Sequence, residues 1–148
     1  MSLQARCILA VGFGFDDEWR LEKAWMESGL EMALRFAPEE TEAMRRLQQR
    51  ETPPTPAVLL VNSGRKELLR WVRRQQSLRE LIAIVCDGEC NEEEIKRAYA
   101  LGADACARKG SDFAEAIRLL KRVEDYWRKA RYALDAQQDV AASERELV

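Results

Sequence analysis

Asn62 is the polar residue with the most informative position in this chain. It ends an apolar run, residues 56–62 (PAVLLVN), that is typical of a buried strand, and the loop residues Ser63 and Gly64 follow it. In proteins that alternate strands and helices, ligands bind and chemistry takes place at the carboxyl ends of the strands. A carboxylate at this position could act as a nucleophile or bind a metal ion, but a carboxamide is a poor substitute for both. We therefore expect a site whose central reactive group is missing.

The other residue types restrict the chemistry further. The 148 residues include no histidine, so the commonest general base and the commonest transition-metal ligand are absent. A zinc site would need all four thiolates, and no C-x-x-C pair is present. We interpret the cysteines as free, buried thiols in a reducing compartment. They are Cys7, Cys86, Cys90 and Cys106. Because no nucleophile is paired with a base, we expect no enzymatic activity and no cofactor.

Composition predicts one globular domain in the cytoplasm. Hydrophobic residues make up 47% and charged residues 34% of the chain, which suits a packed core under a solvated surface. The net charge of -2 provides no general attraction to nucleic acid or membranes, and no apolar run approaches the ~20 residues of a membrane span. A basic group with Trp71 resembles a nucleic-acid stripe, but Glu67 and Glu80 dilute it, so we favour a solvated helix face. The group is Arg65, Lys66, Arg70, Arg73, Arg74 and Arg79.

Short apolar runs alternate with helical spacing five times along the chain. The strand-like runs are residues 5–11, 32–36, 56–62, 81–85 and 103–107. Asp16 and Asp17, then Asn91, then Ser111 or Asp112 have the chemistry of helix caps. Five strand–helix units in series predict an α/β fold, with a parallel sheet covered by helices on both faces.

The final helix is predicted to run from Ser111 to about Leu134, which is about 36 Å at 1.5 Å per residue. We expect a domain over residues 4–132. Residues 133–148 are expected to form a helical extension or a disordered tail, because they contain few large apolar side chains. Tyr126, Trp127 and Tyr132 lie where the helix would leave the domain, and we interpret them as interface anchors. The alternative is that Trp127 only covers the core.

Two segments carry a resemblance to a known family. Residues 93–105 (EEIKRAYALGADA), followed by Lys109, resemble the receiver domain of two-component response regulators, the CheY-like fold. Residues 120–127 (LKRVEDYW) are similar to the last helix of the stand-alone regulators that partner bacterial phytochromes. The likeness covers residues 6–132. It implies a (βα)5 flavodoxin-like, three-layer sandwich with a five-stranded parallel sheet of order 2-1-3-4-5.

The resemblance also assigns roles to positions. In receivers an acidic pair and an aspartate hold Mg²⁺, and the aspartate takes a phosphoryl group from a kinase phosphohistidine. A Ser or Thr and a Lys bind the phosphoryl oxygens, and an aromatic residue reports the state. The acidic pair corresponds to Gly12 and Phe13, and the aspartate corresponds to Asn62. The Ser or Thr corresponds to Cys86, the aromatic residue to Cys106 and the lysine to Lys109. Only the lysine keeps its residue type, so the resemblance implies a degenerate site without metal.

These losses indicate an atypical receiver, or pseudo-receiver, that acts in phosphorelay signal transduction by protein–protein interaction without aspartyl phosphorylation. The resemblance implies a protein partner such as a sensor kinase or photoreceptor, and a homodimer through the last two helices. The alternative is a receiver-fold switch that responds to oxidation of Cys86 and Cys106, or to a small ligand in the former phosphorylation pocket. A buried unpaired cation is costly, so we expect Lys109 to contact Asn62 or Asp87.

Overall fold

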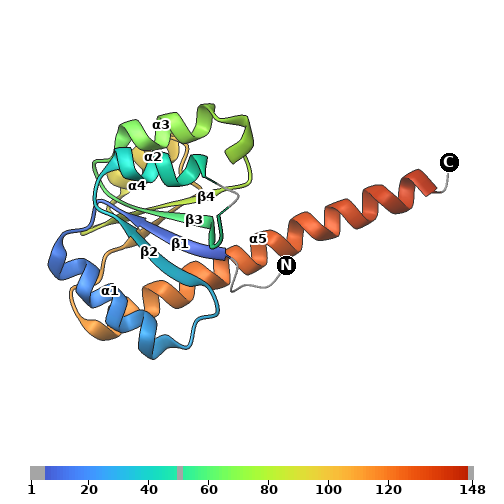
Figure 1. Ribbon diagram of the computed structural model, residues 1–148. Helices are drawn as coiled ribbons and strands as arrows, with labels where there is room; N and C mark the ends of the chain where they lie inside the picture. The colour runs from blue at the N-terminus through green and yellow to red at the C-terminus, as the bar shows by residue number, and fades with distance from the viewer. Residues whose placement is uncertain (1–5, 50–51, 147–148) are drawn as a thin grey trace.

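The computed structural model describes residues 6–49 and 52–146, with side chains up to residue 133. Five parallel strands form one sheet in the order β2-β1-β3-β4-β5, which confirms the predicted fold class and strand order (Figure 1). The strands are β1 (Arg6–Val11), β2 (Ala33–Ala37), β3 (Thr55–Asn62), β4 (Ile82–Asp87) and β5 (Ala105–Arg108).

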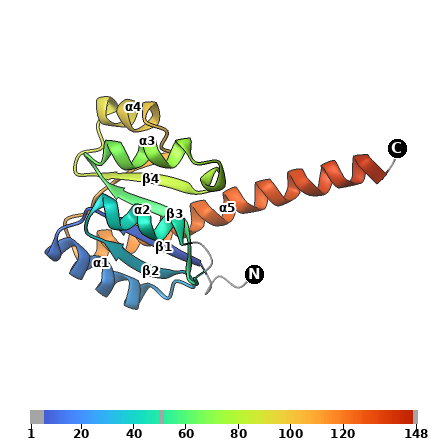
Figure 2. The ribbon, with the colours of Figure 1, turned by 45° about the horizontal axis from the view of Figure 1, so that its top comes forward.

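Helices cover both faces of the sheet. They are α1 (Phe15–Ser28), α2 (Glu40–Gln48), α3 (Lys66–Arg74), the short 3-10 helix η2 (Gln76–Leu78), α4 (Glu92–Ala100) and α5 (Phe113–Glu146). α1 and α5 lie on one face and α2, α3 and α4 on the other (Figures 1 and 2). No described helix is long and apolar enough to cross a lipid bilayer.

The sheet separates two hydrophobic cores. On β1, Ile8 and Ala10 face the core shared with α1 and α5, and Leu9 and Val11 face the core under α2, α3 and α4. The other strands alternate in the same way. Because both faces of each central strand are buried, the strands read as continuous apolar runs. This is why residues 56–62 could be recognised as a strand without an alternating pattern.

Several helix ends follow the predicted capping chemistry. Asn91 caps α4, with its Oδ1 accepting the N–H of Glu94 at 3.0 Å, and Asp112 caps α5, with its Oδ1 accepting the N–H of Glu115 at 2.8 Å. The interpretation of Asp16 and Asp17 as caps is wrong. Gly14 occupies the N-cap of α1 and both aspartates lie in the first helical turn, where their charge suits the helix dipole. Their side chains are thus available for other contacts.

α5 is longer than the sequence predicts. It has 34 residues, about 51 Å at 1.5 Å per residue, and projects out of the domain (Figure 1). The expected end near Leu134 was wrong because it was based on the loss of large apolar side chains. Residues 135–146 contain neither Gly nor Pro and are rich in good helix formers, so helical propensity continues where the apolar stripe stops. The helical alternative for the tail therefore agrees with the structure through Glu146. Residues 147–148 lie outside the described residues. The domain boundary at residue 132 stays a prediction.

Arg73, from the predicted basic stripe, has a structural role. Its Nε donates to Gly102 O at 2.6 Å, its Nη1 to Leu81 O at 3.2 Å and its Nη2 to Asp104 Oδ2 at 2.7 Å. The same carboxylate oxygen accepts the backbone N–H of Ala83 at 2.8 Å. The guanidinium therefore fastens α3 to the loops before β4 and β5.

Replacing Arg73 by Ala is expected to lower the free energy of unfolding by about 2–4 kcal/mol, because the change removes charge-assisted hydrogen bonds to two backbone carbonyls and to the Asp104 carboxylate. Arg70→Ala is the matched control on the same helix. Arg70 has only an exposed contact of 3.6 Å with Glu67, so the expected change is within about 0.5 kcal/mol. Urea denaturation measures both values. Equal effects of the two substitutions would contradict the structural role of Arg73.

Candidate functional site

The carboxyl edge of the sheet gathers the residues that the sequence singled out. Asn62 ends β3, Asp87 ends β4 and Lys109 follows β5. Gly12 and Phe13 follow β1, which lies beside β3 in the sheet. The strand order reverses between β1 and β3, and such a switch point is where open α/β sheets bind ligands.

The carboxamide of Asn62 joins two loops. Its Nδ2 donates to the carbonyl of Gly12 at 3.0 Å, and its Oδ1 accepts the backbone N–H of Ser63 at 3.1 Å. A carboxylate could not make the first of these contacts, because it has no N–H to donate. Asn62 therefore has a structural role that its amide performs and an aspartate would not.

Arg65 occupies the space beside Gly12. Its Nη2 lies 3.4 Å from the same Gly12 carbonyl that Asn62 contacts, and its Nε is buried without a hydrogen-bond partner. A Cβ atom at position 12 would overlap the Arg65 guanidinium, and Gly12 has a φ of 79°, which also favours glycine. The guanidinium thus fills the volume that a side chain at position 12 would need. Sequence reasoning placed Arg65 only in the basic stripe and missed this role.

The residues at this edge do not fit Mg²⁺, which prefers hard oxygen ligands in octahedral geometry. Gly12 has no side chain and Phe13 is buried in the core at 4% exposure. The amide oxygen of Asn62 is already bonded to Ser63, and the Arg65 guanidinium adds a positive charge. Among residues 6–49 and 52–146, no cluster of three or more His, Cys, Asp or Glu is arranged to hold a metal.

Lys109 is paired with Asp17. Its Nζ forms an ion pair with Asp17 Oδ2 and lies 6.0 Å from the centroid of the Phe13 ring. Asp17 Oδ1 also accepts from Arg20 Nη1 at 2.9 Å. The predicted contact of Lys109 with Asn62 or Asp87 was wrong for the side chain, since Lys109 reaches Asp87 only through its backbone N–H, 2.7 Å from the Asp87 carbonyl. The side chain turns instead to the first turn of α1.

Asp87 belongs to a second group of contacts, on the side of α4. Its Oδ2 accepts the backbone N–H groups of Glu89 and Cys90, each at 3.0 Å. Burial opposes ionisation of Asp87, but hydrogen bonds from Glu94, from these backbone groups and from Ser63 outweigh it and lower its pKa to about 2. The same hydrogen bond to Asp87, followed by burial, raises the pKa of Glu94, whose Oε2 is buried.

The structure therefore separates the two predicted pocket residues. Asp87 and Asn62 line a cavity of about 210 Å³ between the β3–α3 loop and α4, together with Glu94 and Arg97. Lys109 lies with Asp17 on the side of α1 and α5. A single pocket with Lys109 and Asp87 is not present among the described residues.

The four cysteines fall into two kinds. Cys86 faces the core under α1 and α5 and Cys106 faces the opposite core, so the predicted pair of switch thiols does not meet across the neighbouring strands. Burial raises the pKa of Cys86 to about 12 and that of Cys7 to about 11, so both thiols are protonated near neutral pH. Cys106 instead has a partner that sequence reasoning missed, because the Sγ of Cys90 lies 3.2 Å from its own.

The aromatic residues of α5 differ in their surroundings. Trp127 packs half-buried against the core, and its role as an interface anchor stays a prediction. Tyr126 and Tyr132 are exposed, as is Tyr99 on α4.

α1 presents an exposed apolar stripe that the sequence did not reveal, because only the inward-facing residues of this helix were predicted. This α1 stripe consists of Phe15, Trp19 and Met26, which are 83%, 58% and 64% exposed.

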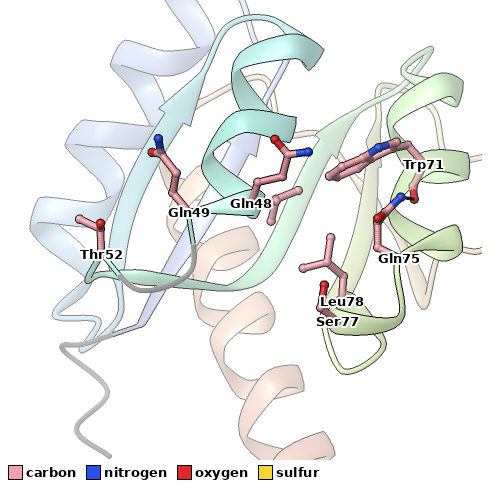
Figure 3. Close-up of a pocket in the computed structure, with 8 residues that line it drawn as sticks. Gln48, Gln49, Thr52, Trp71, Gln75, Ser77 and Leu78 are labelled. Atoms are coloured by element: carbon pink, nitrogen blue, oxygen red, sulfur yellow. Dashed lines mark hydrogen bonds between the residues drawn. The ribbon is translucent and has the colours of Figure 1, made fainter.

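A larger cavity of about 570 Å³ lies between α2 and α3 (Figure 3). It is formed at the C-terminal ends of these helices, so it opens at the amino edge of the sheet, away from Asn62. Gln48, Trp71 and Gln75 are among its lining residues, which include no charged side chain. The lining includes the hydroxyl groups of Thr52 and Ser77 but no ionisable side chain that could act as a base beside them, and it does not belong to the site at the carboxyl edge.

The acid pair predicts a pH effect on stability. Because the pKa of Glu94 is raised above 4.5 in the folded state, its contribution to stability is complete at low pH and is lost as pH rises through that pKa. Glu94→Gln keeps a donor toward Asp87 and removes the titration, so its urea midpoint should exceed that of the unchanged protein more at pH 7.5 than at pH 4.5. Glu93→Gln is the control, at an exposed neighbouring residue that is paired with Arg97. Its urea midpoint should differ from that of the unchanged protein by the same amount at both pH values. The same pH trend in both variants would contradict the pairing of Glu94 with Asp87.

No family model and no curated protein matches the chain. Solved structures do match it. A response regulator in red light signaling of R. palustris shares 18% identity with a TM-score of 0.74, covering 82% of this chain and 93% of that one. A phosphorylated cyanobacterial phytochrome response regulator, RcpA, shares 18% identity with a TM-score of 0.70 over the same fractions. A chemotaxis response regulator of Vibrio cholerae shares 17% identity with a TM-score of 0.65, covering 80% and 98%.

These similarities agree with the sheet order and with the five α-helices. At such identities they concern the fold, and the chemistry has to be judged from the residues at the carboxyl edge. The chain has the fold of response-regulator receiver domains.

Proposed function

We propose that this protein is an atypical receiver that acts in two-component or phosphorelay signalling as a protein-binding module, without aspartyl phosphorylation. The observation that carries the proposal is the position of the Arg65 guanidinium against Gly12, beside the amide of Asn62. A receiver needs carboxylates and a divalent cation at this place. Here a fixed cation, a glycine and an amide occupy it, and all three are joined by hydrogen bonds.

The remaining charges at the edge are compensated within the protein. Lys109 is neutralised by Asp17, and the carboxylate of Asp87 is bonded to the loop before α4. In a switchable receiver these groups would respond to an incoming phosphoryl group. Internal compensation instead holds the edge in one state, which suits a module whose surface is constant.

The α1 stripe is the proposed surface for a signalling partner. Phe15, Trp19 and Met26 lie on one side of α1, and Lys23 Nζ lies 5.8 Å from the Trp19 ring centroid. Neighbouring exposed large apolar side chains are typical of protein interaction sites, and Trp is among the commonest anchors. Because two of the similar structures are regulators in phytochrome or red light signalling, we propose a cytoplasmic sensor kinase or photoreceptor as the partner.

A second surface suits self-association. We define the α4–β5–α5 face by Tyr99, Tyr126 and the edge strand β5. The Tyr126 hydroxyl donates to Asp104 O at 3.3 Å, which positions an exposed aromatic ring beside the open edge of the sheet. We propose that two copies of the chain associate here, through the last two helices.

Acetyl phosphate with Mg²⁺ is expected to add no phosphoryl group to the protein, and beryllofluoride with Mg²⁺ should leave its melting temperature unchanged. Asn62→Asp should behave in the same way, because Arg65 still fills the space beside Gly12 and Phe13 still provides no oxygen. Intact-mass spectrometry and thermal shift measure these outcomes, with an ordinary receiver as positive control. An Mg²⁺-dependent adduct on the unchanged protein would overturn the proposal.

The two surfaces can be tested with reciprocal controls. Trp19→Ala should abolish capture of a kinase or photoreceptor from the native organism and leave self-association unchanged, because Trp19 is exposed and outside the α4–β5–α5 face. Tyr99→Ala with Tyr126→Ala should weaken self-association at least tenfold, since aromatic anchors contribute about 2 kcal/mol or more at interfaces. Sedimentation equilibrium and pull-down provide the two readouts. A protein that is monomeric at high concentration, or one whose partner binding survives Trp19→Ala, would contradict the corresponding assignment.

A further inference from the structure

Cys90 and Cys106 form a close pair of thiols at the α4–β5–α5 face. Their Sγ atoms lie 3.2 Å apart, and both residues are partly exposed. Cys7 and Cys86 are buried. The pair joins the loop before α4 to the edge strand β5, beside the end of the β4–β5 ladder at Asp87 and Arg108.

The loop holds Cys90 in a defined orientation. Cys90 has a φ of 53°, in the left-handed region that non-glycine residues adopt rarely. Its N–H donates to Asp87 Oδ2, and the next residue, Asn91, caps α4 through Glu94. Contacts on both sides of Cys90 therefore maintain a backbone conformation that directs its thiol at Cys106.

We propose that Cys90 and Cys106 are a redox modification site that forms a reversible intramolecular disulfide with oxidants of the peroxide class. One thiolate attacks a peroxide oxygen, the O–O bond breaks, and a sulfenic acid and hydroxide form. The second sulfur then attacks the sulfenic sulfur, and the S–O bond breaks as the S–S bond forms. In sum, two thiols and one hydrogen peroxide give one disulfide and two waters, and a dithiol reductant reverses the change.

The surroundings raise the pKa of three of the four thiols. Burial, and then the hydrogen bond with Cys90, raises the pKa of Cys106 to about 12, so Cys106 is a protonated thiol near neutral pH. The raised pKa values of the buried thiols Cys7 and Cys86 keep them out of the reaction.

The disulfide would fasten the start of α4 to β5. Both elements belong to the α4–β5–α5 face. Because the disulfide already restricts this face, less conformational entropy would be lost when two copies of the oxidised protein associate. We therefore expect the oxidised protein to self-associate several-fold more tightly than the reduced protein. This consequence rests on the proposed function, but formation of the disulfide does not.

The experiment treats the full chain with hydrogen peroxide, alkylates the remaining thiols and maps the peptides by mass spectrometry. The expected result is one Cys90–Cys106 cross-link, reversed by dithiothreitol, with Cys7 and Cys86 alkylated after denaturation. Cys90→Ser and Cys106→Ser should each lose the cross-link. Cys7→Ala, the matched control, should keep it, with circular dichroism confirming that each variant is folded.

Several results would overturn the site. They are the absence of a cross-link at peroxide concentrations that oxidise a dithiol control, a cross-link between two chains, and equal oxidation of Cys86. Sedimentation of the oxidised and reduced protein then tests the consequence separately. Unchanged association in a fully cross-linked protein would overturn the regulatory part, and a monomer in both states would instead point to failure of the proposed dimer.

Discussion

Charge compensation at the carboxyl edge of the sheet is the constraint on which the site depends. Lys109 is largely removed from solvent, with 29% of its side chain exposed, so it needs a negative partner nearby. Asp17 supplies it and also contacts Arg20, which ties the loop after β5 to the first turn of α1. Arg65 is likewise held against the carbonyl of Gly12. Among the described residues, Lys109 and Asp87 are thus satisfied within the protein, and Arg65 brings a further positive charge to the place where a divalent cation would lie in a receiver.

The fold could be predicted in detail from the sequence, and the site only in part. Strand order, parallel pairing and the caps Asn91 and Asp112 follow from local patterns and from the resemblance, and each agrees with the structure. The contacts of Arg65 with Gly12 and of Cys90 with Cys106 join residues 53 and 16 positions apart. Which of several nearby polar groups a long side chain reaches depends on its rotamer and on the space left by its neighbours, and no local pattern records either.

The loop between β4 and α4 would respond both to pH, through Glu94, and to oxidation, through Cys90. Asp87 accepts the N–H of Cys90 through one carboxylate oxygen, and its hydrogen bond with Glu94 raises the pKa of the Glu94 carboxyl. The conformation that directs Cys90 at Cys106 therefore depends on the same carboxylate that raises the pKa of Glu94. Ionisation of Glu94 and oxidation of Cys90 would act on one short segment between β4 and α4. Under the proposed redox role, this coupling would give the α4–β5–α5 face a route of control that does not pass through Asn62.

The continuation of α5 to Glu146 affects how the protein could hold anything attached beyond it. A glycine-rich tether lets its cargo explore a sphere, so its effective concentration is set by linker length. A continuous helix acts as a stiff spacer that fixes both distance and direction, advancing about 1.5 Å with each residue. Adding or removing one residue would also rotate the far end by about 100°, since 3.6 residues make one turn. The number of residues in α5 thus sets the direction in which its far end faces as well as its distance from the domain. A single-residue insertion would change both.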